Sequence, residues 1–191
     1  MKGTSPERFD TEFETTRGRF VVTIQRDWAP RGADRFHSLI ESGFFAEVRF
    51  FRVIKGFMAQ FGISPDPRTA AVWRVRRIDD DPVVASNTRG RVSFATAGPG
   101  TRTTQLFINL VDNSRLDSMG FAPVGEVTKG MDVVDSLFSG YGEGAPSGRG
   151  PAQDRIQAEG NAYLDREFPE LDAVLAARIV DGERGGAGPG A

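Results

Sequence analysis

"FFRVIKGFMAQFG", residues 50–62, contains two short apolar runs that also carry Arg52 and Gln60. EVRFFRVI and FMAQF have the length and composition of β-strands, and Lys55-Gly56 between them is typical of a turn. No Asp or Glu occurs between Glu47 and Asp66. Because an unpaired charge in an apolar environment is costly, we expect Arg52 to have a function that uses its free hydrogen-bond donors.

Outside this stretch the sequence predicts a mainly β protein. TEFETTRGRFVVTI (11–24) indicates two strands, and RVSFAT (91–96), LFINL (106–110) and APVGEV (122–127) indicate further short ones. Two helices are predicted, one from Pro30 to a stop at Gly43 and one over MDVVDSLF (131–138). LDAVLAARIV (171–180) fits either a helix or a strand. Many short strands with two helices favour a closed barrel or sandwich with helices at its ends.

Length and composition indicate one domain. The chain has 191 residues, of which 39% are hydrophobic and 26% charged, enough for a sizeable core. We place a single domain at residues 8–181, with a long loop or insertion at 140–171 that begins in the Gly- and Pro-rich SGYGEGAPSGRGPAQ (139–153). We expect residues 1–7 and 182–191 to be disordered tails.

Several classes of function are disfavoured. A formal net charge of −2 indicates neither a nucleic-acid surface nor a polybasic membrane patch, and no apolar run approaches the ~20 residues of a membrane span. Without cysteine, and with His37 as its one histidine, the chain lacks thiolate nucleophiles and a His-rich metal site. We interpret DDDP (79–82) as a solvated acidic turn, because hard cations need spaced oxygen ligands. No metal and no cofactor are therefore expected.

The compartment is an expectation only. The first residues, MKGTSPERF, have no apolar core typical of a signal peptide, which favours a cytoplasmic protein. A periplasmic or secreted protein whose signal peptide had been removed would look the same.

The opening stretch belongs to a longer pattern. GRVSFATAGPGTRTTQLFINL (90–110) places Gln105 before an apolar strand, and RLDSMGFAPVGEV (115–127) follows it. Together with residues 50–62 these segments resemble the cyclophilins, the peptidyl-prolyl cis-trans isomerases, over roughly residues 19–138. The resemblance implies an eight-stranded antiparallel β-barrel closed by two α-helices, with its site on the outside because eight strands leave an interior that side chains just fill.

The resemblance also implies roles for individual residues. Arg52 takes the catalytic position, and proline-containing peptides and folding proteins are the expected partners. The expected substrate-binding residues are Phe51, Phe57, Met58, Gln60, Ala95, Thr96, Ala97, Gln105, Phe107, Leu116 and Phe121. Among them, Phe57, Met58, Phe107 and Leu116 are expected to form the proline pocket. Ala95, Thr96 and Ala97 are expected to line the groove where backbone groups pair with an extended peptide.

The chain departs from the family pattern at several positions. Phe51 and Phe121 stand where the family commonly has histidine, so a mechanism that needs either histidine is excluded. Arg115 stands in place of the tryptophan before the Leu-Asp pair, a position that contacts the inhibitor cyclosporin in sensitive members. Binding of cyclosporin is therefore expected to be weak.

The expected chemistry explains why an arginine would suffice. Rotation about a prolyl peptide bond breaks amide resonance and crosses a barrier of about 18–20 kcal/mol, without any covalent bond being made. A guanidinium that binds the twisted amide better than the planar one lowers this barrier. Two alternatives stay open: a non-catalytic module that binds proline-containing peptides in the same groove, and a chaperone that uses exposed aromatic side chains. Arg52, Gln60 and Gln105 together favour the enzyme, since an apolar binding groove would not need three polar groups beside it.

Overall fold

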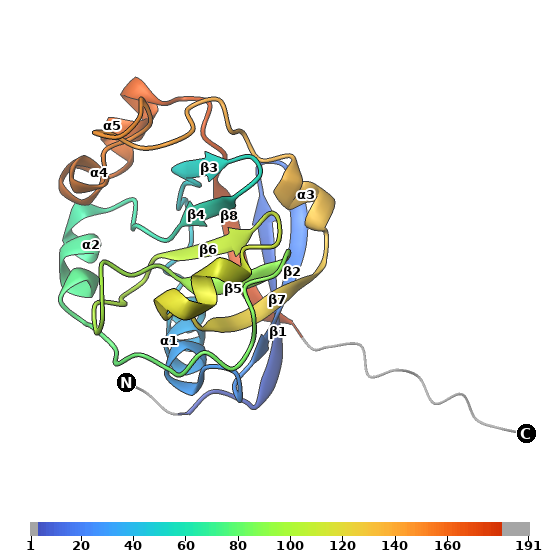
Figure 1. Cartoon of the computed structure of the whole chain (residues 1–191). Coiled ribbons are helices and arrows are strands. Elements are labelled where there is room, and N and C mark those ends of the chain that lie inside the picture. The colour runs from blue at the N-terminus through green and yellow to red at the C-terminus, as the bar shows by residue number, and fades with distance from the viewer. Residues whose placement is uncertain (1–3, 181–191) are drawn as a thin grey trace, which may run out of the picture.

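One antiparallel sheet of eight strands forms the body of the protein in a computed structural model that describes residues 4–180 (Figure 1). The mainly β class is therefore confirmed. The strands run in the spatial order β3-β4-β6-β5-β7-β2-β1-β8. Their bounds are β1 (Arg8–Thr15), β2 (Gly18–Gln25), β3 (Arg52–Ile54), β4 (Met58–Phe61), β5 (Arg91–Phe94), β6 (Leu106–Asn109), β7 (Pro123–Lys129) and β8 (Val174–Val180).

The sheet curls without closing into a full ladder. Its edge strands are β3 and β8, which form no ladder with each other in the described part of the chain. The two edges meet where residues 47–50 run beside 172–174: Arg49 forms an isolated bridge with Ala173, the Phe50 amide donates to the Asp172 carbonyl over 3.0 Å, and the Val174 amide donates to the Val48 carbonyl over 2.8 Å. β3 is only three residues long. It pairs with β4 but is not continued by a ladder to β8, which would be needed to close the barrel. The sheet is thus a curled half-barrel, and the expected closed barrel is not confirmed.

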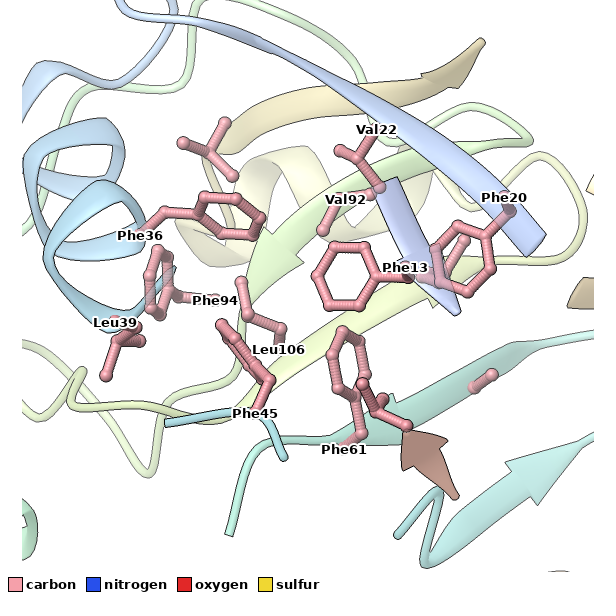
Figure 2. Packing of buried hydrophobic residues seen from close by; sticks show 14 of the residues in the cluster. Phe13, Phe20, Val22, Phe36, Leu39, Phe45, Phe61, Val92, Phe94 and Leu106 are labelled. Atoms are coloured by element: carbon pink, nitrogen blue, oxygen red, sulfur yellow. The ribbon is translucent and has the colours of Figure 1, made fainter. Parts of the chain in front are cut away.

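The inner face of the curled sheet is filled mainly by phenylalanines. Phe13 of β1 stacks on Phe20 of β2 with ring centroids 5.1 Å apart, and the edge of Phe61 from β4 approaches Phe13 at 5.9 Å. Figure 2 shows Phe36 and Leu39 of α1 (Pro30–Glu41) closing this core from one side. Fully burying each such side chain contributes about 1.5–3 kcal/mol, so the core fixes where each strand lies.

The structure contains more helices than expected. The helices at Pro30 and at 131–138 are present as α1 and the shorter α3 (Met131–Asp135), while residues 171–180 prove to be mostly strand β8. Three further helices were not predicted: α2 (Pro67–Arg74), α4 (Gln153–Glu159) and α5 (Asn161–Glu167). The expectation of two helices was therefore wrong. A short 3₁₀ helix also covers Ser114–Met119.

Asp81 caps α1 from a distant part of the chain. Its buried carboxylate accepts hydrogen bonds from the amides of Arg31 and Gly32, at 3.1 and 2.9 Å, and from Arg102 Nη2 at 3.0 Å. These amides belong to the first turn of α1, where the backbone N–H groups have no carbonyl acceptor within the helix. The expectation of a solvated acidic turn was wrong for Asp81, because its charge is offset by Arg102 and by the helix N-terminus.

Residues 140–171, expected as a long loop, form a packed layer instead. Helices α4 and α5 lie beside α2 at one end of the sheet (Figure 1). They enclose a second apolar cluster made of Phe51, Ile63, Ile156, Tyr163, Leu164 and Leu171. At the junction of α4 and α5, Gly160 has φ +62° and a Cβ there would lie 2.0 Å from the Pro65 carbonyl oxygen. Glycine thus allows the pair of helices to dock closely on the segment before α2.

The N-terminal segment is partly anchored. Ser5 is buried and its amide and hydroxyl both donate to Asp34 Oδ1, at 2.9 and 2.8 Å, so the expected looseness of residues 1–7 does not hold for Ser5. Of the expected tails, residues 1–3 and 182–191 lie outside the described residues. Within residues 4–180 no helix has the length and hydropathy to cross a bilayer.

Replacing Phe51 tests whether α4 and α5 form an integral layer. Phe51 is 2% exposed and packs only within the second cluster. We expect Phe51→Ala to lower the free energy of unfolding by about 3–5 kcal/mol, as for other buried phenylalanines, measured by urea denaturation. The control Leu175→Ala, at a side chain that is 44% exposed, should cost less than about 1 kcal/mol. Equal effects of the two changes would contradict the packing of this layer.

Candidate active-site groove

Strand register places Arg52, Gln60 and Phe107 in a row across three neighbouring strands. Arg52 of β3 pairs with Gln60 of β4, and Gln60 pairs with Phe107 of β6. Side chains alternate between the two faces of a sheet, and the flanking Val53 and Ala59 belong to the inner core. The row therefore lies on the outer face, where sequence reasoning placed the site.

A cavity of about 340 Å³ opens beside this row. Its apolar part is a separate cluster of Met58, Phe107 and Leu116, against which Phe57 and Phe121 pack. The rings of Phe107 and Phe121 meet edge to face, with centroids 5.5 Å apart. A cavity of this size, which combines an apolar part with several polar groups, has the character of a small-ligand site.

Most of the predicted site residues line this one cavity. They are Arg52, Phe57, Met58, Gln60, Ala95, Thr96, Ala97, Gln105, Phe107, Leu116 and Phe121. Three more lining residues were not predicted: Thr101, Thr103 and Gln153. The first two are ordinary polar residues in a loop, and Gln153 comes from α4, whose position follows only from the packing of α4 and α5.

Phe51 is not part of the groove, which corrects its expected role. Its side chain is buried beneath α4 and α5, among Ile156, Tyr163 and Leu164. The adjacent Arg52 points to the cavity instead. An apolar residue suits position 51 because residues 140–171 supply it with apolar partners.

Arg115 lies at the side of the groove. Its guanidinium carbon is 4.9 Å from the centroid of the Phe57 ring, and its Nη1 donates to Asn113 Oδ1 over 3.0 Å. The side chain is therefore held against the groove wall by a cation–π contact and a hydrogen bond, although the residue as a whole is exposed.

A chain of polar side chains runs along the groove. Arg52 Nη1 donates to Gln60 Oε1 over 2.9 Å, and Gln60 Nε2 donates to Gln105 Oε1 over the same distance. Gln60 is only 6% exposed, so its amide can neither rotate freely nor exchange these partners for water. The chain holds one side of the guanidinium in a defined orientation.

Arg52 also forms an ion pair, which the sequence did not predict. Its Nε donates to Glu143 Oε1 over 2.7 Å and its Nη2 to Glu143 Oε2 over 2.6 Å, a bidentate pair. Arg52 has no carboxylate partner in its own segment, as expected, but the expectation that its donors are free was wrong for Nε and one N–H of Nη2, because Glu143, 91 residues away in the chain, accepts from both. Donation from Arg52 and from the Gly144 amide lowers the pKa of Glu143 below its ordinary value.

Another part of the cavity lining is a tight loop that contains Ala95, Thr96, Ala97 and Thr101. Thr96 and Thr101 join their hydroxyls at 2.8 Å, and the Ala97 amide donates to Thr101 Oγ1 over 2.9 Å. The Ala95 amide donates to the Gln105 carbonyl over 2.9 Å. The amides of Ala95 and Ala97 are therefore already occupied by partners within the protein.

The geometry agrees with an independent comparison of the sequence. Residues 10–158 match the model of the family described as cyclophilin-type peptidyl-prolyl cis-trans isomerase/CLD. The chain belongs to the cyclophilin family. This assignment covers the strands that carry Arg52, Gln60 and Phe107, and it also reaches α4.

Individual cyclophilins are similar over most of their length. The chain is 34% identical to peptidyl-prolyl cis-trans isomerase B of Escherichia coli over 177 residues, which cover 88% of this chain and 97% of that protein. It is also 34% identical to a peptidyl-prolyl cis-trans isomerase of Acinetobacter baylyi over 135 residues, covering 66% and 70% of the two chains.

Solved structures show the same fold. A cyclophilin-type isomerase of Cryptosporidium parvum superposes with a TM-score of 0.68 at 19% identity, covering 92% of this chain and 99% of that one. A second crystal structure of that protein, obtained in the presence of the dipeptide Ala-Pro, gives a TM-score of 0.67.

Within residues 4–180 of this chain, no group of three or more His, Asp or Glu side chains converges as metal ligands.

Titration of Glu143 tests the ion pair. A carboxyl whose pKa is lowered by folding stabilises the protein above the pKa of the unfolded chain, ~4.3, and loses that contribution as the pH falls through the lowered value. We expect the Glu143 carboxyl, followed by carbon-13 NMR, to titrate below the ordinary range, and to move upward in Arg52→Ala. Because Glu143 is 38% exposed, the stabilisation is at most about 1 kcal/mol. An unchanged midpoint in Arg52→Ala would show that the pair does not form in solution.

Proposed function

We propose that this cyclophilin-type peptidyl-prolyl cis-trans isomerase uses Arg52 as its catalytic residue, on Xaa-Pro bonds of peptides and folding proteins. The observation that carries the proposal is that Arg52 lines the same cavity as the apolar cluster of Met58, Phe107 and Leu116, which is suited to a proline ring. Gln60 orients this guanidinium through a hydrogen bond of 2.9 Å.

The role of Arg52 follows from the chemistry of the bond. In the twisted transition state the amide nitrogen regains a lone pair, which is a better hydrogen-bond acceptor than the planar amide nitrogen. A guanidinium held nearby therefore stabilises the transition state more than either ground state. Arginine remains charged at every working pH and presents its donors in a planar fork, so Arg52 needs no proton transfer.

The cavity supplies the other half of the mechanism. Met58, Phe107 and Leu116 offer apolar contact to the proline ring, while the chain on either side of the proline would lie along Ala95–Ala97. Fixing the ring while the preceding carbonyl turns is what allows binding energy to be used on the twisted state. The Ala-Pro dipeptide used with the Cryptosporidium parvum relative supports this class of ligand.

A non-catalytic module would use the same groove to bind proline-containing peptides without turnover. A chaperone role through the aromatic side chains would not depend on Arg52. The polar chain from Arg52 to Gln105 supports the enzyme over both alternatives, since binding or shielding apolar segments does not require an ordered guanidinium.

Replacement of Arg52 tests the proposal directly. We expect Arg52→Ala to lower kcat/KM on a short Xaa-Pro peptide by about 100-fold, in line with loss of a key transition-state donor, while the far-UV circular dichroism stays the same. Arg52→Lys should also be poor, because a point charge lacks the planar fork. Turnover is measured by NMR exchange or a protease-coupled assay.

Arg91→Ala provides the matched control. Arg91 pairs with Glu126, and its side chain is 25% exposed against 23% for Arg52, but it lies on β5 outside the lining of the cavity. We expect its turnover to match the wild type. Near-full activity of Arg52→Ala would contradict the catalytic role.

Weak binding of cyclosporin is a second part of the proposal. Where sensitive relatives are expected to have tryptophan, Arg115 presents a guanidinium that already contacts Phe57 and Asn113. A ligand that packs against this wall would have to displace these contacts or accept a less apolar surface. This arrangement disfavours a large apolar inhibitor without affecting a proline ring deeper in the cavity.

Arg115→Trp should restore part of the inhibition. We expect the inhibition constant for cyclosporin to fall by about tenfold, equivalent to ~1.4 kcal/mol, as the indole replaces the guanidinium beside Phe57. Turnover of short peptides should change less than about twofold, since Arg115 does not line the cavity. Tight inhibition of the wild type, or no gain in Arg115→Trp, would refute the assigned role of position 115.

A further inference from the structure

Glu143 reaches Arg52 from a loop whose own backbone is firmly closed. The Glu143 carbonyl accepts from the Gly150 amide over 2.8 Å, and the Ala145 amide donates to the Gly150 carbonyl over 3.0 Å. A Cβ on Gly148 would lie 2.2 Å from the Glu143 carbonyl oxygen, so this close approach requires glycine. The loop thus presents the Glu143 side chain from a fixed backbone.

Both ends of the loop are anchored in the layer formed by α4 and α5. Before it, the Tyr141 ring packs edge to face with Phe138 and Phe168, with centroids 5.1 and 5.0 Å apart. After it, the Ala152 amide donates to the Tyr163 hydroxyl over 3.1 Å. Residues 140–171 therefore hold the Glu143 carboxylate at hydrogen-bonding distance from Arg52.

The ion pair occupies a particular edge of the guanidinium. Glu143 accepts from Nε and Nη2, and Gln60 accepts from Nη1. A guanidinium has five N–H donors, so one N–H on each terminal nitrogen remains beyond these three bonds, and the one on Nη1 has only a long contact with Met58 Sδ, at 3.9 Å. Arg52 lines the cavity, whereas Glu143 is not among the lining residues in the part of the chain described. Glu143 therefore holds Arg52 from behind and leaves the cavity open.

We propose that Glu143 is a positioning residue for the isomerase reaction. It fixes the Arg52 side chain so that the two terminal guanidinium nitrogens face the twisted amide. This inference rests on the proposed catalytic role of Arg52. A free arginine side chain carries about 2 kcal/mol of rotamer entropy, which the enzyme would otherwise lose at the transition state. A guanidinium ordered beforehand by Glu143 and Gln60 avoids that cost.

An inhibitory latch is the opposite interpretation of the same pair. A latch would have to block the cavity or release Arg52 by moving. The closed backbone around Glu143 and its position outside the cavity lining argue against both. The two interpretations predict opposite changes in turnover when the carboxylate is removed.

The test compares Glu143→Gln, Glu143→Asp and Glu143→Ala in the full chain. We expect Glu143→Gln and Glu143→Ala to lower kcat roughly tenfold, as for misplacement of a reacting group, with KM changed less than about twofold. Glu143→Asp, which keeps the charge, should recover part of the loss. Nitrogen-15 NMR of the Arg52 Nε–H should show a signal protected from exchange with water in the wild type and lost in Glu143→Gln.

Glu126→Gln is the matched control. The Arg91–Glu126 pair spans 3.4 Å, and its side chains are 25% and 36% exposed against 23% and 38% for Arg52 and Glu143. It lies away from the cavity lining, so its loss should leave kcat unchanged. Equal losses in Glu126→Gln and Glu143→Gln would overturn the proposal.

A double variant separates positioning from a merely structural effect. If Glu143 acts only through Arg52, Arg52→Ala combined with Glu143→Gln should be no less active than Arg52→Ala alone. An additive loss, an unchanged kcat in Glu143→Gln or a raised kcat would each overturn the positioning role. Full activity of Arg52→Ala would instead contradict the catalytic role of Arg52, so the two failures are distinguishable.

Discussion

β4 is buried on both faces, and the arrangement of the groove depends on this constraint. Ala59 and Phe61 pack into the aromatic core, while Met58 and Gln60 form the floor and the polar chain of the cavity. Because alternate residues of a strand must point to opposite faces, a slip of β4 by one residue would place Gln60 in the core and Phe61 outside. The stability of the core and the register of the site are therefore secured by the same hydrogen-bonded ladder.

Residues 140–171 extend this dependence to a part of the chain that lies between β7 and β8. The helices α4 and α5 cover Phe51 and dock near α2, and the loop before them delivers Glu143 to Arg52. The entropic cost of closing a loop grows only slowly with its length, so a long insertion destabilises the fold little. A loop that must place a carboxylate accurately, however, needs a rigid support. The second apolar cluster provides that support, and this explains why packing remote from the cavity bears on the site.

The electrostatics of the groove follow from the same arrangement. Arg52 and Glu143 form an ion pair whose net charge is zero. The guanidinium is therefore held in place without leaving an uncompensated positive charge in the groove. The pair is partly exposed, which limits its contribution to stability and leaves orientation as its main effect. An uncharged polar chain through Gln60 and Gln105 completes the support without adding a titrating group.

The sequence was sufficient to predict the strands around Arg52 and the helix from Pro30, because side-chain alternation and helix start signals are short-range properties. Its ordered motifs were sufficient to predict the family and eleven residues of the cavity lining. The packed form of residues 140–171 was beyond it, since α4 and α5 are seven-residue helices stabilised by tertiary burial rather than by their own propensity. The same reason explains Phe51, whose buried apolar partners apart from Ile63 lie within residues 156–171, and Asp81, whose helix lies 49–50 residues earlier in the chain. The main feature that the sequence did not predict is the partner of Arg52. The sequence determined that an arginine stands in this strand, but only the tertiary structure decided that Glu143 would hold it. A contact between residues 91 positions apart leaves no periodic signal in either segment.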